Sequence, residues 1–148
     1  MSKNNQNFDE RQQIERGKAF QWSFCAAIIL LALFYMLEDL FELCQFSTYF
    51  IFITTFWISF SVFNTKVILN DAFLGIKETS GRGLFIVYGV VGLFMLAVNI
   101  FLIINDGSLL TGNNLNDTVA IMIISISMLE MFAVSEVKCI KDKKLAEK

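Results

Sequence analysis

Histidine is absent from this 148-residue chain, and cysteine occurs only three times, at Cys25, Cys44 and Cys139. No two cysteines stand at the spacing of metal ligands, so zinc and haem sites are not expected. No nucleophile–base pair is visible, and the Gly-Arg-Gly segment at 81–83 is too short to cradle a phosphate. A net charge of −2 and a pI near 5.1 give no sign of a nucleic-acid surface. The sequence therefore predicts a non-enzymatic protein without metal or cofactor that does not bind nucleic acid directly.

Basic residues are missing from two stretches, 38–45 and 105–117, whose charged residues are all acids. The twelve Lys and Arg residues fall into three blocks outside these stretches, namely Lys3, Arg11, Arg16 and Lys18; Lys66, Lys77 and Arg82; and Lys138, Lys141, Lys143, Lys144 and Lys148. Short cytoplasmic loops of membrane proteins concentrate Lys and Arg, whereas acids contribute little to orientation. The alternation predicts a four-pass protein of the bacterial cell membrane with both termini in the cytoplasm.

Four long apolar runs separate the basic blocks from the base-free stretches. The chain is 55% hydrophobic with a mean hydropathy of +0.59, whereas soluble domains are about 45–50% apolar. The runs are long enough, since about 20 helical residues cross a hydrocarbon core of roughly 30 Å. A soluble helix would show a polar stripe every three or four residues, and residues 26–36 show none. The predicted spans cover 19–37, 46–63, 84–104 and 118–137.

The predicted fold is an all-α integral membrane four-helix bundle. Its parts are a cytoplasmic N-terminal segment, a membrane domain and a basic cytoplasmic tail, at 1–18, 19–137 and 138–148. A helix that starts near Glu10, capped by Asp9 or Asn7, is expected to lead into the first span. The turn at 38–45 is short, so the first two spans should be antiparallel neighbours. No small-residue cleavage site follows the first run, so a cleaved signal peptide is not expected.

Two local features leave alternatives open. The inner loop at 64–83 alternates apolar and polar residues, which fits either a short amphipathic helix in the headgroup region or an extension of the second span. The second span carries hydroxyls that bond either to their own helix or across to another; these are Thr54, Thr55, Ser59 and Ser61. Gly89 and Gly92 in the third span could allow a close helix approach, although the common dimer motif has a spacing of four.

Glu130 is the sharpest candidate for a functional residue inside the membrane. It lies about twelve residues into the fourth span, roughly 18 Å deep at 1.5 Å per residue. A carboxyl group there is costly and usually marks a proton, ion or ligand path inside the bundle. Alternatively, Glu130 is a hydrogen-bonded structural residue or extends toward the inner surface beside Glu136. The other spans offer polar groups at matching depth, namely Ser59, Ser61, Tyr88 and Cys25. Asn99 is the other strongly polar side chain, and a direct pair with Glu130 is not expected.

Two short motifs carry a resemblance to a known group of proteins. The chain reads Asp-Glu-Arg-Gln at 9–12, followed by Arg-Gly-Lys-Ala-Phe at 16–20, and Asn-Asp-Ala-Phe-Leu-Gly-Ile at 70–76. In these motifs it resembles uncharacterised small prokaryotic multi-pass membrane proteins with an Asp-Glu-Arg signature before the first span. Some of those proteins are encoded beside a small helix-turn-helix regulator. The resemblance therefore implies a multi-pass membrane fold and a cytoplasmic regulator as partner.

The two motifs also define a candidate docking surface on the cytoplasmic face. Its residues are Asp9, Glu10, Arg11, Gln12, Arg16, Asn70 and Asp71. Alternatively, Asp9 and its neighbours only cap the helix and anchor it at the headgroups. The predicted function is binding of a cytoplasmic partner, in a protein embedded in the lipid bilayer. One alternative is a small transporter or immunity-type protein that uses Glu130. Another is a structural subunit of a larger membrane complex. A homo-oligomer of the chain is a further possible assembly.

Overall fold

Helices account for all four apolar runs, because a backbone in lipid must satisfy its own hydrogen bonds. The computed structural model describes residues 9–40, 46–73, 82–106 and 112–146. Its helices are α1 (Glu10–Tyr35), continued by a π-helical turn (Met36–Leu40), α2 (Thr48–Leu69), α3 (Arg82–Asn105) and α4 (Gly112–Ala146). Within these ranges, four helices are long and apolar enough to cross a membrane. The prediction of an all-α fold with four candidate spans is confirmed.

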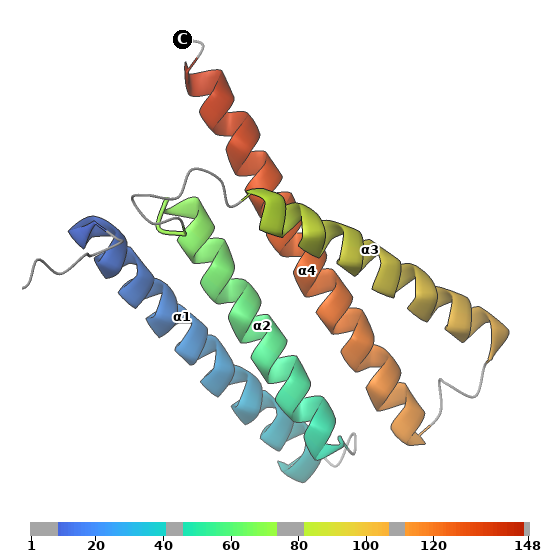
Figure 1. Ribbon diagram of the computed structural model, residues 1–148. Coiled ribbons are helices and arrows are strands. Elements are labelled where there is room, and N and C mark those ends of the chain that lie inside the picture. The colour runs from blue at the N-terminus through green and yellow to red at the C-terminus, as the bar shows by residue number, and fades with distance from the viewer. Residues whose placement is uncertain (1–8, 41–45, 74–81, 107–111, 147–148) are drawn as a thin grey trace, which may run out of the picture.

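The first and last helices are longer than a bilayer crossing requires. Asp9 caps α1 through a capping box with Gln12, and the helix continues through Gly17 into its apolar part. The 35 residues of α4 extend over about 52 Å, against a hydrocarbon core of roughly 30 Å. Figure 1 shows the C-terminal turns of α4 projecting beyond the other helices. The polar start of α1 and the charged end of α4 therefore extend from the apolar region at the same end.

The four helices lie in a row in the order α1, α2, α4, α3. Among the described residues, contacts join α1 to α2, α2 to α4 and α4 to α3, and they join no other pair of these helices. Figure 1 shows the antiparallel neighbours α1 and α2 at one side of the row and α3 at the other. The prediction that the first two spans are neighbours is confirmed. The row places α2 and α4 at the centre and leaves α1 with one neighbour.

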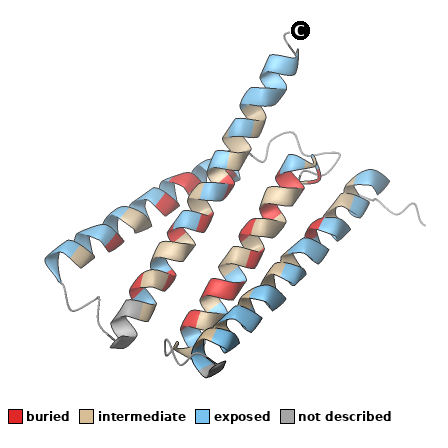
Figure 2. Ribbon diagram, turned by 180° about the vertical axis from the view of Figure 1, so that it is seen from behind, coloured by how far each residue is buried: buried red, intermediate tan, exposed pale blue. Residues whose placement is uncertain are grey.

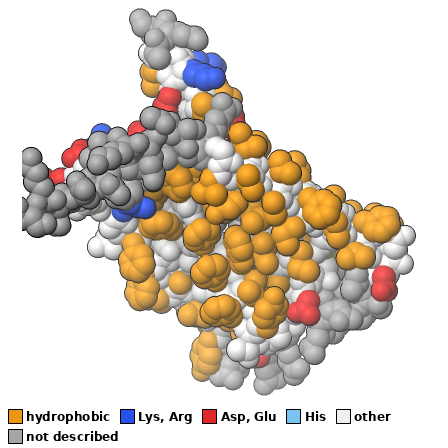
Figure 3. Space-filling view, in the orientation of Figure 1, with side chains coloured by type: hydrophobic (Ala, Val, Ile, Leu, Met, Phe, Trp, Pro, Cys, Tyr) orange, Lys and Arg blue, Asp and Glu red, His pale blue; other side chains and the backbone are white. Residues whose placement is uncertain are grey.

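Buried residues follow this arrangement. They concentrate on α2 and α4, as Figure 2 shows, whereas in the described part of α1 only Ala19 is buried. Apolar side chains cover the middle of the face seen in Figure 3, and charged side chains lie toward its ends. Phe94 and Ile104 expose 70% and 76% of their surface. Such an outward-facing apolar band is suited to contact with lipid hydrocarbon.

The charges separate between the two ends of the row. Every described Lys and Arg lies on the first turns of α1 or α3 or the last turns of α2 or α4, which meet at one end. At the other end, the described charged residues are all acids, namely Glu38, Asp39, Asp106 and Asp117. Helix α2 continues to Leu69, so the beginning of the inner loop extends the second span. The expected amphipathic helix falls largely on 74–81, outside the described residues.

Two glycines allow α3 to approach α4 closely. A Cβ atom on Gly89 would lie 2.7 Å from Cγ of Phe132, and one on Gly92 would lie 3.1 Å from the backbone oxygen of Ser125. Small residues at such positions permit the van der Waals packing on which helix association in lipid depends. The glycine pair with a spacing of three, which looked weak in the sequence, therefore lies at a helix–helix contact.

Gly92→Ala should disturb this contact. The added methyl group meets backbone that cannot rotate away, so we expect the free energy of unfolding to fall by about 1–3 kcal/mol. The measurement is reversible unfolding of the full-length protein in mixed micelles, followed by circular dichroism. Gly17→Ala is the matched control, because a Cβ there meets no described atom within 4 Å; it should preserve or raise stability. Equal stability of both variants would contradict the close approach.

Candidate functional site

Helix α2 ends in a turn that places Asp71 in the left-handed region, with φ of 56°. The N–H of Ala72 donates to the oxygen of Val67 at 3.0 Å, and that of Asp71 to Ile68 at 3.3 Å. These two bonds form a Schellman motif, whose left-handed position is usually glycine. Aspartate tolerates this conformation better than most residues. Ala72 and Val67 are fully buried beside Ala19 of α1, which supplies the apolar contact typical of the motif.

Polar contacts from two other helices converge on this turn. The Gln12 amide of α1 donates to the backbone oxygen of Asp71 at 3.0 Å. The Lys138 ammonium of α4 lies 2.8 Å from the Asp71 carboxylate and donates to the Leu69 oxygen, also at 2.8 Å. One turn of chain therefore connects α1, α2 and α4. Lys138 also complements the partial negative charge at the C-terminus of α2.

A second set of contacts supports the first. The Asn70 amide donates to the Glu15 carboxylate at 2.9 Å, and Glu15 forms an ion pair with Lys18 at 2.7 Å. Together these residues form what we call the Asp71 cluster: Gln12, Glu15, Lys18, Asn70, Asp71 and Lys138. Nearby, the Lys66 ammonium lies 5.2 Å from the ring centroid of Trp22, within the range of a cation–π interaction between α2 and α1.

The structure brings the two sequence motifs together but engages many of their residues within the chain. The Asp9 carboxylate accepts a hydrogen bond from the N–H of Glu10 at 2.7 Å. The N–H of Asp9 in turn donates to the side-chain oxygen of Gln12. Gln12, Asn70 and Asp71 belong to the Asp71 cluster, and Arg16 is half-buried and also engaged. Of the predicted docking residues, Glu10 and Arg11 remain, and both are exposed on the first turn of α1.

Sequence reasoning missed Glu15, its ion-pair partner Lys18, and Lys138 as members of this site. Glu15 lies one turn after Gln12 on the same face of α1, so helical spacing was a usable signal. Lys138 carried no such signal, because its contact with Asp71 depends on α4 lying beside α2. The Lys138 side chain is 16% exposed and that of Asp71 is 70% exposed. The cation therefore lies against the helix end while the carboxylate faces outward.

Glu130 links α4 to α2 within the membrane-spanning part. The Ser61 hydroxyl donates to one carboxyl oxygen of Glu130, and the Thr65 hydroxyl lies 3.4 Å from the other. Ser61 and Thr65 are four residues apart, so both project from one face of α2. The Glu130 residue is otherwise exposed on the surface of the row.

The remaining intramembrane candidates lie apart from Glu130. Tyr88 packs with Phe85 beside the buried Met131, and Ser59 lines a groove toward α1. Asn99 is buried, and its amide donates to the backbone oxygen of Thr118 at 3.3 Å, which joins α3 to the first turns of α4. Of these groups, Asn99 bonds one pair of helices, Tyr88 contributes packing, and the structure does not gather them into one site.

No protein-family model, curated protein or solved structure matches the chain. Among the described residues, no three His, Cys, Asp or Glu side chains lie close enough together to hold a metal ion. Cys25 and Cys139 are free thiols. The described polar contacts connect neighbouring helices, and exposed polar residues lie at one end of the row.

Substitution of Asp71 should separate backbone strain from charge. Asp71→Asn keeps the tolerance for a left-handed φ and loses the ion pair, so the free energy of unfolding should fall by less than about 1 kcal/mol. Asp71→Ala should lower the free energy of unfolding by roughly a further 1–2 kcal/mol, because alanine is disfavoured in the left-handed conformation. Unfolding in mixed micelles measures both. Asp142→Asn on the exposed end of α4 is the control, and an Asp71→Ala variant as stable as this control would contradict the assignment.

Glu130→Gln should leave stability close to that of the natural chain, because the amide oxygen still accepts from Ser61. Glu130→Leu removes the contact and should lower the free energy of unfolding by about 0.5–2 kcal/mol, the range for hydrogen bonds between membrane helices. Ser61→Ala should reproduce much of that loss. The same unfolding assay applies, and a Glu130→Leu variant of unchanged stability would exclude a structural role for the carboxyl group.

Proposed function

We propose that this chain is a non-enzymatic protein of the bacterial cell membrane that binds a soluble cytoplasmic partner through the ends of α1 and α4. The observation that carries the proposal is that the start of α1 and the projecting end of α4 lie at the same end of the row, where the described basic residues also lie. Lys and Arg concentrate on the cytoplasmic side of membrane proteins. This rule orients the row with that end, and therefore both termini, in the cytoplasm.

The exposed surface combines two short segments of different charge. The first turn of α1 offers Glu10 and Arg11, and the last turns of α4 offer exposed Lys141, Lys143 and Lys144. Three lysines on one helix end favour a partner with an acidic surface, because opposite potentials accelerate and orient association. A small regulator protein, which the sequence motifs suggest, is the partner class that we propose.

The Asp71 cluster gives this surface its rigidity. Gln12 and Glu15 hold the start of α1 against the end of α2, while Lys138 holds α4 there. A surface fixed before binding loses less conformational freedom when a partner binds. In this proposal the cluster positions the docking segments, and the exposed residues beyond it contact the partner.

Glu130 supports this division of roles. Proton and ion paths inside membranes use chains of polar groups, whereas this carboxyl group contacts two hydroxyls on one neighbouring helix. The geometry favours a hydrogen-bonded connection between α2 and α4 over a transport path.

The docking proposal predicts that photo-crosslinking residues at positions 11 and 144 capture the same soluble protein in intact cells. Mass spectrometry identifies the captured protein. Charge reversal by Lys141→Glu, Lys143→Glu and Lys144→Glu should reduce its capture at position 11 at least about fivefold, since the attraction becomes repulsion. A crosslinker at the exposed Phe94 of α3 is the control and should capture no soluble protein.

Orientation is checked in the same cells. In intact cells, a membrane-impermeant maleimide should label a variant that retains only Cys44. It should label a variant that retains only Cys139 only after the cells are lysed. Labelling of Cys139 in intact cells would overturn the orientation. Crosslinks at positions 11 and 144 only to other copies of the chain would overturn the soluble partner.

A further inference from the structure

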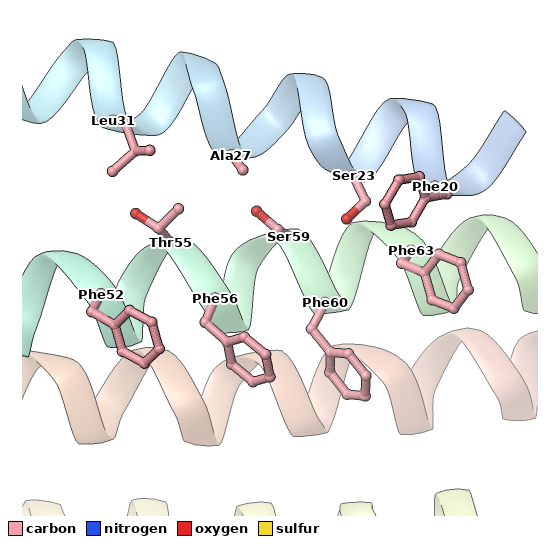
Figure 4. A pocket seen from close by; sticks show the side chains of 10 residues that line it. All are labelled: Phe20, Ser23, Ala27, Leu31, Phe52, Thr55, Phe56, Ser59, Phe60 and Phe63. Carbon is pink, nitrogen blue, oxygen red and sulfur yellow. The ribbon is translucent and has the colours of Figure 1, made fainter. Parts of the chain in front are cut away.

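A groove of about 490 Å³ runs between α1 and α2 in the membrane-spanning part (Figure 4). Its lining is almost entirely apolar, and phenylalanine supplies much of it. Phe20 of α1 and Phe52 of α2 line the groove and are 65% and 67% exposed, so it opens to the surroundings of the helices. In a membrane, those surroundings are lipid hydrocarbon.

Two hydroxyl groups from α2 make this groove more than an apolar gap. Thr55 and Ser59 are only 9% and 8% exposed, and neither hydroxyl has a hydrogen-bond partner among the described residues. Figure 4 shows both groups directed from α2 toward α1, into the groove. A buried hydroxyl without a partner is unfavourable. A ligand that accepts hydrogen bonds in the groove would satisfy both.

A ladder of aromatic rings borders these hydroxyls. The rings of Phe52 and Phe56 are 6.4 Å apart at 14°, and those of Phe56 and Phe60 are 5.9 Å apart at 7°. Three nearly parallel rings, one per helical turn, offer edges and faces against which another flat ring can pack.

The depth of the hydroxyls restricts the ligand further. In the predicted second span, 46–63, Thr55 lies eight and Ser59 four residues from the inner end, about 12 and 6 Å of helix. Both therefore lie inside the hydrocarbon layer and not at the interface where the ester groups of phospholipids reside. The ligand must carry its acceptors on a group that dissolves in the membrane interior.

We propose that the groove between α1 and α2 binds a prenylated quinone-type lipid. Hydroxyls four residues apart on a helix are separated by roughly 6 Å, which suits two carbonyl oxygens on opposite sides of a six-membered ring. Thr55 and Ser59 donate to these oxygens, the ring packs against the phenylalanine ladder, and the isoprenoid tail extends into lipid. The inference concerns binding only and does not depend on the proposed cytoplasmic partner.

The test uses the full-length protein in phospholipid nanodiscs, titrated with a short-chain prenylquinone. Trp22 precedes the groove residue Ser23 and Trp57 follows Phe56, so a bound quinone should quench tryptophan fluorescence in a saturable manner. The double variant Thr55→Val with Ser59→Ala should weaken the affinity at least about fivefold. Its thermal midpoint should be unchanged or higher, because hydroxyls without partners have been removed.

Thr54→Val is the matched control, because this hydroxyl is equally buried and unpartnered but does not line the groove. It should leave quinone affinity unchanged. A prenyl alcohol of equal chain length should compete poorly, since it lacks the ring and its carbonyls.

Four outcomes would overturn the proposal: quenching that does not saturate, unchanged affinity in the double variant, equal competition by the prenyl alcohol, or crosslinks between position 56 of two copies that resist added quinone. The last outcome would identify a second copy of the chain as the occupant.

Discussion

The arrangement of three helices depends on a single left-handed residue, Asp71, at the end of α2. Its backbone oxygen binds α1 through Gln12, and its carboxylate binds α4 through Lys138. Apolar contact between helices gains little in lipid, because lipid tails are as apolar as the side chains. Polar contacts near the ends of the helices therefore carry much of the specificity of the row. The Schellman motif fixes the direction of these groups before the helices meet.

Each pair of neighbouring helices is joined by different chemistry. Glycines bring α3 onto α4, and the Glu130 carboxyl group bonds α4 to the hydroxyls of α2. By contrast, α1 contributes one buried residue, Ala19, to the described core. It is held by polar contacts at its start and by Phe34 against Phe46 and Phe50 near its other end, and the groove lies between these contacts. The boundary that contains the groove therefore also holds two buried hydroxyls without a described partner, those of Thr55 and Ser59.

Hydropathy and charge were sufficient to predict four spans, their approximate limits and the pairing of the first two. Depth identified Ser61 as a possible partner of Glu130, and the structure shows that bond. Depth also selected Ser59 and Tyr88, which face other neighbours, because depth alone does not say which side of a helix a residue occupies. Helical periodicity could have added Thr65, four residues after Ser61. The contact between Asp71 and Lys138 could not be predicted. It joins residues 67 positions apart and exists only because α4, and not α3, lies beside α2.

The length of α4 has a mechanical consequence. Its charged C-terminal turns extend beyond the other helices. Counted from the C-terminal end of α4, Lys138 is the first described residue that bonds another helix. Force applied to the free end is transmitted first to the Asp71 turn, and through Gln12 to the start of α1. The glycine contact and the Glu130 bond lie farther along the helix. Traction on the tail would therefore strain the cap of α2 before it separates helices within the bilayer.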